Sequence, residues 1–330
     1  MYVQPKILIQ QANEAVSSAS CNPKKLTALH TGIAAGANLL VALLTYLLGI
    51  GIGDTGGLSG IGTRATLETA QSILQIAVSA ATPFWSMGFV ALTLHFVRQY
   101  QATPRTLLTG FQHWAPVVRM LLLEALIYFG IVFGSVQIGS YLYTLTPFAD
   151  ELIQLVEQSG TVDVAALQEL LLQQDQATLM RIFWSMAPFL LLPAILVAIP
   201  VSYRLRMAQF VLLEQPKMGA LYAILFSSRM MKKNCLQLFK LDLHFWWFYA
   251  LEILVQVLCY GDLILPLMGV ELGMNGVLAS FLFYALALVC QIGLYVWQKP
   301  QIITSYALFY DYLLPRQEET EAKTERETQS

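Results

Sequence analysis

Six apolar stretches, each long enough to cross a bilayer, constrain this sequence more than any other feature. They run near 30–52, 70–97, 115–146, 182–203, 243–260 and 277–298. A bilayer core is crossed by about 20 residues of helix, because backbone polar groups left unpaired in hydrocarbon are too costly for an open structure. The pattern therefore predicts an all-α, polytopic membrane bundle with six transmembrane helices.

Composition agrees with a membrane protein and argues against other classes. Of the 330 residues, 56% are apolar and 12% are charged, and the charged share is about half that of a soluble domain. The net charge of −2 supplies no basic stripe for nucleic acid. Cysteines are scattered singly, and no histidines stand four residues apart as paired ligands would. We therefore expect no nucleic-acid partner, no metal site and no cofactor.

The basic residues are distributed unevenly around the six predicted spans. With the N-terminus inside, all of the 19 Lys and Arg residues except Arg64 and Arg181 fall on one face. The other face receives the segment 150–175, which contains several acids and no base. Because Lys and Arg accumulate in cytoplasmic loops, both termini should be cytoplasmic. The chain then divides into a cytoplasmic segment at 1–28, a six-span membrane domain at 29–314 and a charged, disordered cytoplasmic tail at 315–330.

The two outer loops have different patterns. The glycine-rich segment 53–62 is typical of a flexible connector. In the second loop, apolar residues recur at helical spacing between Val164 and Leu171, which predicts a short amphipathic helix on the outer surface. Two interpretations are open for this helix: a lid packed on the ends of the bundle, or a docking point for a protein partner at the acidic loop.

On the cytoplasmic side, the segments 104–114 and 216–234 are predicted to form elbow helices that lie in the membrane interface. The second has an apolar stripe of Met218, Leu221, Tyr222 and Leu225. Its basic residues share a face and are expected to contact anionic lipid headgroups; they are Arg229, Lys232 and Lys233. The aromatic run 245–249 should mark the point where the fifth span enters the bilayer.

Small residues and prolines suggest how the spans pack. The pairs Gly32 with Gly36 and Gly130 with Gly134 would let helix backbones approach closely. The fourth span is the one most expected to break, because it contains three prolines; they are Pro188, Pro193 and Pro200. Such a break can serve a substrate pathway or shape the bundle. The sequence Phe-Trp-Ser-Met occurs at 84–87 and again at 183–186, which favours two tandem hairpins.

Three acids are the candidate functional residues, because an ionisable group in hydrocarbon is costly unless it has a partner or faces water. Glu252 follows Asp242 by ten residues, about 15 Å along a helix and hence near the middle of the membrane. It could handle protons or cations, or be a neutral acid that is hydrogen-bonded to a neighbouring helix. For Glu124, a contact with Arg119 five residues away is the simpler interpretation. Asp242 lies in a polar group with Lys240 and His244.

Two short motifs match pieces of intramembrane aspartyl proteases. They are Gly-Ile-Gly-Asp at 51–54 and Tyr310 with Asp311. In such enzymes the two carboxylates lie close enough to share a proton. Here the predicted spans place Asp54 and Asp311 on opposite sides of the membrane, in the reverse order along the chain. The sequence therefore favours a protein that is not an enzyme.

Three stretches in the second half carry a family resemblance. They are AILFSSRMMKKN at 223–234, FKLDLHFWW at 239–247 and YALFYDY at 306–312. They resemble the bacterial integral membrane proteins of domain-of-unknown-function family 975, which is related to the membrane domain of glycerophosphoryl diester phosphodiesterases. This sequence has Lys233 where the family usually has glycine. The resemblance implies a six-span protein of the bacterial cytoplasmic membrane and supplies no catalytic residue.

Two functional hypotheses follow. The first is a non-catalytic bundle that acts in transport or as an accessory component of the cell envelope, surrounded by membrane lipids. The second is a membrane module of a lipid-handling, glycerophosphodiester-related enzyme system. Because no soluble stretch of this chain can hold a catalytic domain, a partner in trans would have to supply it.

Overall fold

The structure is a computed structural model that describes residues 4–19, 21–51, 58–150, 153, 176–261 and 276–329. It forms two compact units: unit 1 contains residues 1–118 and 207–330, and unit 2 contains residues 119–206. Every regular element in the described residues is a helix. The predicted all-α class is therefore confirmed.

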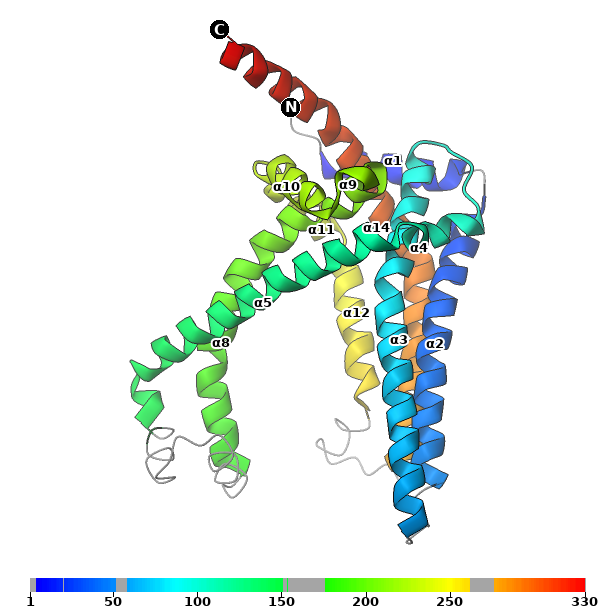
Figure 1. The fold of residues 1–330 in the computed structure, drawn as a ribbon, viewed down its shortest axis with the longest axis vertical. Coiled ribbons are helices and arrows are strands. Elements are labelled where there is room, and N and C mark those ends of the chain that lie inside the picture. Colours follow the sequence, from blue (N-terminus) through cyan, green and yellow to red (C-terminus); the bar gives the residue numbers. More distant parts are fainter. Residues whose placement is uncertain are drawn as a thin grey trace. The chain divides into compact units, whose positions relative to one another are not determined.

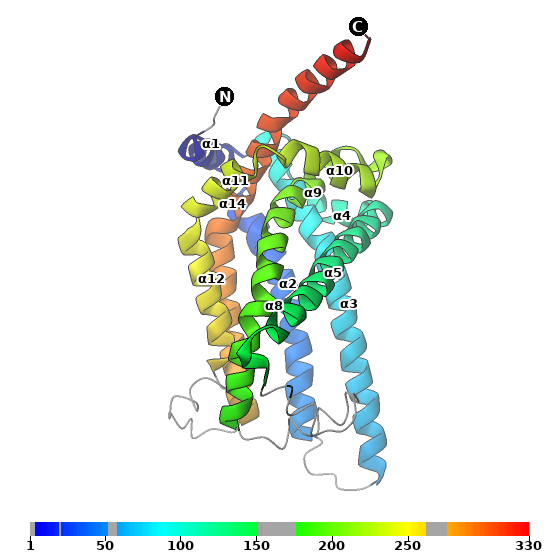
Figure 2. The same cartoon turned by 90° about the vertical axis from the view of Figure 1, so that its left-hand side faces the viewer.

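Four helices form the body of unit 1. They are α2 (Pro23–Gly51), α3 (Leu58–Val97), α12 (Trp246–Cys259) and α14 (Gly276–Gln329). α14 contacts the other three, and α2 also contacts α3, so these helices lie side by side in Figures 1 and 2. α14 is thus the helix around which unit 1 is assembled.

Other helices gather at one end of these four, and we call them the cap (Figures 1 and 2). The cap consists of α1 (Pro5–Ser18), η1 (Pro104–Leu108), α4 (Thr109–Gln112), α9 (Ala208–Glu214), η3 (Pro216–Met218), α10 (Ala220–Met231) and α11 (Cys235–His244). α1 buries Leu8 and Ala12 on one face and contacts α14. α1 was not predicted, because this segment is too short and too polar to be recognised as a membrane span.

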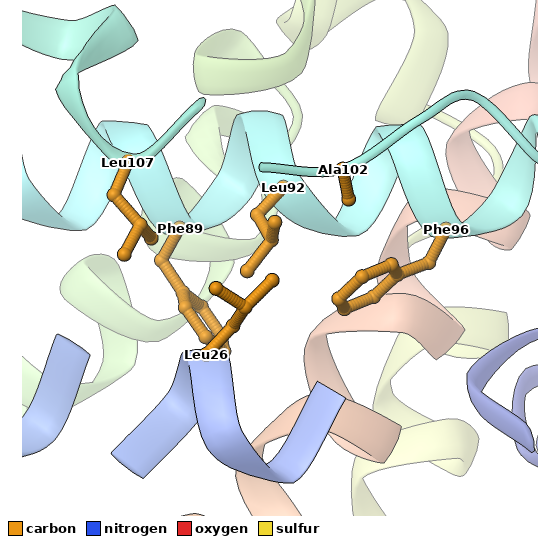
Figure 3. Packing of buried hydrophobic residues seen from close by; sticks show 6 residues of the cluster. All are labelled: Leu26, Phe89, Leu92, Phe96, Ala102 and Leu107. Atoms are coloured by element: carbon orange, nitrogen blue, oxygen red, sulfur yellow. The ribbon is translucent and has the colours of Figure 1, made fainter. Parts of the chain in front are cut away.

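The exposure of apolar side chains changes along α3, and this change separates the cap from the rest. Ile73 and Ile76 are 62% and 68% exposed, whereas Leu92 and Phe96 are buried. The buried part belongs to a cluster that joins α2, α3 and the elbow after α3 (Figure 3). A soluble protein rarely leaves so much apolar surface in water, so the uncovered part of α3 is suited to hydrocarbon.

Unit 2 is built from most of α5 (Trp114–Thr144), the turn η2 (Pro147–Ala149) and α8 (Gln176–Leu205). Tyr143 joins its helices: the hydroxyl donates to the carbonyl of Phe148 at 2.8 Å and lies 3.0 Å from the Ser185 hydroxyl. Most apolar side chains of α5 and α8 are exposed within this unit. They too require an apolar environment that the described chain does not supply.

Among the described residues, five helices are long and apolar enough to cross a membrane, or six if α11 and α12 count as one span. α11 and α12 meet at an angle of 67° at Phe245. α12 begins in the aromatic run, as predicted, but its 14 residues reach only about 21 Å, less than the hydrocarbon core of about 30 Å. The fifth predicted span is therefore the one that departs from a simple crossing.

The four glycines predicted to mediate helix packing are not sites of close approach within their own units. A Cβ atom at Gly32, Gly36, Gly130 or Gly134 would have no neighbour within 4 Å. A pattern of small residues marks a surface that permits close approach, and the helices of this chain approach one another elsewhere. The sites of close approach are glycines whose added Cβ would collide with a backbone carbonyl group; they are Gly88, Gly110 and Gly139.

The fourth span is one helix and is not broken. α8 runs without interruption from Gln176 to Leu205 and contains all three prolines. Figure 1 shows it bending along its length, which is the usual effect of proline in a helix. Neighbouring turns of a helix keep most of their hydrogen bonds when one amide proton is missing, so a bend suffices.

Some predictions fall where the structure does not test them. The outer amphipathic helix predicted at 164–171 and the first half of the glycine-rich loop, 53–57, lie outside the described residues. The second half, 58–62, belongs to α3, so the flexible connector predicted there is wrong. α14 continues as a helix to Gln329, and the disorder predicted for 315–330 stays a prediction. Both elbow segments do contain helices, as expected; their placement in a membrane interface stays a prediction.

Candidate functional site

A row of polar side chains follows one face of α14. Its members are Gln291, Tyr295, Lys299, Tyr306 and Tyr310, and we call this row the polar stripe. The intervals of four and seven residues place them on one side of a helix. From Gln291 to Tyr310 the stripe extends about 28 Å, from the apolar part of unit 1 into the cap.

Glu252 of α12 contacts the stripe at Tyr295. The Tyr295 hydroxyl donates a hydrogen bond to Glu252 Oε1 at 2.5 Å and accepts one from Gln291 Nε2 at 3.3 Å. The Lys299 ammonium group lies 4.6 Å from the centre of the Tyr295 ring. The acid that the sequence singled out is therefore hydrogen-bonded to a neighbouring helix and has a cation nearby.

Asp242 of α11 contacts the stripe at Tyr306. The Asp242 side chain is buried, and its Oδ1 accepts a hydrogen bond from the Tyr306 hydroxyl at 2.6 Å. The Tyr249 and Tyr306 hydroxyl oxygens are 2.8 Å apart. Since Tyr306 gives its single proton to Asp242, Tyr249 must be the donor in that second bond. Two tyrosines and one carboxylate thus form a short chain that joins α11, α12 and α14.

At the cap end, Arg98 pairs with two carboxylates. Its Nη2 and Nε atoms donate to the two oxygens of Asp311 at 2.7 and 3.3 Å. Nη2 also forms an ion pair with Glu214 of α9, and the Tyr310 hydroxyl donates to Glu214 Oε2 at 2.5 Å. The hydrogen bonds from Arg98 to Asp311 and Glu214 raise the pKa of the guanidinium. This group of four residues ties α3, α9 and α14 together, and we call it the arginine cluster.

The same pairing recurs three times along the stripe. A tyrosine hydroxyl of α14 donates to a carboxylate of another helix at Glu252, Asp242 and Glu214. Hydroxyl groups both donate and accept, so such chains can hold or pass protons. No group of three or more metal-ligating side chains occurs among the residues that the structure describes. The hydroxyl and carboxylate groups of the stripe and its partners can accept and donate protons.

The comparison with protein families gives one match. The model for the family described as protein of unknown function (DUF975) matches residues 32–317. The chain belongs to this family. The match includes the whole polar stripe and all of its partners. Searches of curated proteins and of solved structures each found no match.

In this DUF975 protein the three predicted acids have different surroundings. Glu252 and Asp242 both contact the stripe. The depth estimated for Glu252 assumed one straight helix from Asp242, and the bend at Phe245 invalidates that estimate. Glu124 belongs to unit 2, and in the described structure it forms no ion pair with Arg119. Five residues of helix rotate a side chain well away from its starting face, which explains why that pair does not form.

The predicted headgroup contacts lie on the surface of the cap. Arg229, Lys232 and Lys233 are exposed at the end of α10 and in the turn that follows it. Leu221 and Leu225 of the same helix are 60% and 49% exposed. The apolar residues that the sequence predicted on one side of α10 thus form an uncovered face beside the three basic residues. The contact of the basic residues with lipid headgroups stays a prediction.

The arginine cluster and the tyrosines of the stripe were not found from the sequence. Asp311 entered only as part of a rejected protease motif, and Asp54 lies outside the described residues. Tyrosines near span ends are normally taken as interface anchors. The recurrence of Tyr295, Tyr306 and Tyr310 on one helical face was the available signal, because it predicts a shared polar surface.

Proposed function

We propose that this DUF975 protein is a multi-pass protein of the bacterial cytoplasmic membrane that handles protons or cations. It does so without catalysis, as a transport protein or as an accessory component of the cell envelope. Both termini are cytoplasmic in this proposal. The contact between α1 and α14 at the cap supports an even number of crossings, because it brings the two ends of the chain to the same side.

The polar stripe carries the proposal. It brings Glu252 and Lys299 together between helices whose remaining surface is largely apolar. Ionisable groups at such positions cost several kcal/mol, and in membrane proteins they commonly mark a pathway or a binding site. If they only held helices together, apolar side chains of similar size would do so at equal or greater stability. The costly arrangement therefore favours a function over packing alone.

The experiment replaces Glu252 by glutamine in protein reconstituted into liposomes that contain a pH-sensitive dye. A membrane potential set with potassium and valinomycin drives proton uptake, which is measured over a range of external pH. Glutamine keeps the oxygen that accepts the Tyr295 hydroxyl proton, so folding should be preserved. We expect the E252Q variant to lose the pH-dependent flux.

Glu124→Gln is the matched control, since it removes another acid of an apolar helix that is not in the stripe. It should keep the wild-type flux. Equal flux from the wild type and the E252Q variant, with both proteins folded, would reduce Glu252 to a packing role.

A second candidate function is a membrane module of a lipid-handling, glycerophosphodiester-related enzyme with a partner in trans. The exposed apolar and basic face of α10 favours it, because such a face suits a lipid surface or a partner protein. Affinity capture from mild detergent, with identification of bound lipids and proteins, tests it. Specific recovery of an enzyme that cleaves lipid headgroups would favour the module over the transport protein.

A further inference from the structure

A cavity of about 260 Å³ lies in unit 1 where α2, α12 and α14 meet. It is smaller than the typical small-molecule pocket of about 300–1,000 Å³ and so suits a compact ligand. Nothing in the proposed function requires it. Its lining residues are Asn38, Val255, Gln256, Cys259, Tyr284, Ala287, Leu288 and Gln291.

The lining has a distinct chemistry for a cavity between apolar helices. Three carboxamides, from Asn38, Gln256 and Gln291, face the space together with the Tyr284 side chain. No charged side chain lines it among the residues that the structure describes. Carboxamides offer both donors and acceptors, and polar groups in hydrocarbon are costly unless they have hydrogen-bond partners. The cavity is thus suited to a neutral ligand with several hydrogen-bonding groups.

The cavity adjoins the polar stripe through one residue. Gln291 lines the cavity and also donates to the Tyr295 hydroxyl, which in turn donates to Glu252. A ligand that hydrogen-bonds to the Gln291 amide would therefore act on the bond that holds Glu252. Asn38 and Gln256 are exposed, so the cavity reaches the surface of unit 1 and a ligand can enter from there.

We propose that this cavity binds a neutral polyhydroxyl group and couples its occupancy to Glu252. Each hydroxyl both donates and accepts, which matches a carboxamide, whereas a charged ligand would find no counterion in the lining. The group is supplied either by a free polyol or by the sugar headgroup of a neutral glycolipid. The inference goes beyond the proposed proton or cation function, and only the coupling to Glu252 through Gln291 rests on that function.

The test uses two cysteines of the chain as probes. Cys259 lines the cavity, whereas Cys290 is exposed on α14 and is not part of the lining. Two variants are made, in which either Cys259 or Cys290 is the single cysteine of the chain. Both are reconstituted into liposomes and labelled with N-ethylmaleimide. Erythritol is the free polyol, and monoglucosyl diacylglycerol in the bilayer is the glycolipid. At a ligand concentration ten times the dissociation constant, labelling of Cys259 should slow about ten-fold, and labelling of Cys290 should not change.

Asn38→Leu removes one carboxamide from the lining and should abolish the protection of Cys259. The thermal midpoint of unfolding gives a second measurement, in case the thiol reacts too slowly. Ligand should raise the midpoint of the wild type more than that of the N38L variant. This difference separates binding from the general stabilisation of proteins by polyols.

Protection by erythritol assigns the site to a free solute, and protection by the glycolipid assigns it to a headgroup. Equal slowing at both cysteines, or no effect of either ligand on labelling and on the midpoint difference, overturns the inference. Binding is measured here without proton flux. If neither ligand protects Cys259 but E252Q loses the pH-dependent flux, only the cavity inference is refuted. If a ligand protects Cys259 but E252Q keeps the wild-type flux, only the proton or cation function is refuted.

Discussion

Replacing Gly88 by alanine adds a methyl group where the elbow after α3 crosses that helix. The nearest atoms to the added Cβ would be the carbonyl oxygen, carbonyl carbon and Cα of Leu107, all closer than 3 Å. These are backbone atoms, so no change of side-chain rotamer can relieve the collision. Leu107 is itself fully buried in the cluster shown in Figure 3. The elbow must therefore move away from α3 or distort.

Two opposing effects set the magnitude. Alanine in place of glycine favours a helix interior by about 1 kcal/mol. Overpacking typically costs about 1–3 kcal/mol, and a collision with backbone belongs at the upper end. The net expectation is a loss of about 2 kcal/mol. In a unit of this size that loss corresponds to a thermal midpoint lower by roughly 4–8 °C.

Gly32→Ala is the matched control, because the same change there meets no atom within 4 Å. It should leave the midpoint unchanged or raise it slightly through helix propensity. Both variants are purified in the same detergent, and the folded fraction after heating is measured by size-exclusion chromatography with tryptophan fluorescence. Limited proteolysis with chymotrypsin adds a local measurement, since a displaced elbow exposes the buried Leu107 to cleavage.

The two results together decide whether the elbow packs on α3 as described. Equal midpoints for the G88A and G32A variants, with equal cleavage rates at the elbow, would refute the close approach. Rescue of G88A by Leu107→Ala would also contradict the reasoning, because truncating a side chain does not move a carbonyl oxygen.

Three further predictions concern the polar contacts and the topology. Tyr306→Phe removes the hydrogen bond that the Tyr306 hydroxyl donates to the buried Asp242 carboxylate and should cost about 1–3 kcal/mol, measured as a lower thermal midpoint in detergent. The pKa of the Arg98 guanidinium is higher in the folded protein than in the unfolded chain. The stability that this cation contributes is complete below its unfolded-state pKa and is lost only as pH rises through its higher folded-state pKa. We therefore expect this contribution to stay constant between about pH 5 and 9. Arg98→Gln leaves the carboxylates of Glu214 and Asp311 together without the guanidinium that pairs with both, so its midpoint should be lower than that of the wild type. Reporter fusions should show external positions at Gly57 and Ala166 and internal positions at Thr103, Asn234 and Thr324; a reversed pattern would contradict the predicted orientation.

The membrane-facing helices could be predicted from the sequence, because long apolar runs identify them without knowledge of their neighbours. The cap could not. The burial of Leu92 and Phe96 depends on Leu26 and Leu107, which come from other segments. Glycine patterns failed for a related reason: Gly32 permits close approach, but only the folded chain determines that Gly88 is used.

The candidate site was half predictable. Glu252 and Asp242 attract notice because acids are rare in apolar segments. Their partners are tyrosines, which are common in membrane proteins and carry no comparable signal. The arginine cluster joins residues 98, 214 and 311, and pairing over such separations in sequence cannot be inferred from one sequence.

The choice of tyrosine as the partner has a consequence for function. A carboxylate that pairs with a guanidinium, as Asp311 does with Arg98, loses most of that attraction when it is protonated. A carboxylate that accepts a tyrosine hydroxyl, as Glu252 and Asp242 do, can keep the bond through its carbonyl oxygen after it gains a proton. The helix contacts of the stripe can thus survive a change of charge, while the arginine cluster holds α3, α9 and α14 at the cap. It follows that Glu252→Gln should preserve stability and that Tyr295→Phe should lower it. A lower midpoint for E252Q than for Y295F would show that charge, and not the hydrogen bond, holds α12 to α14.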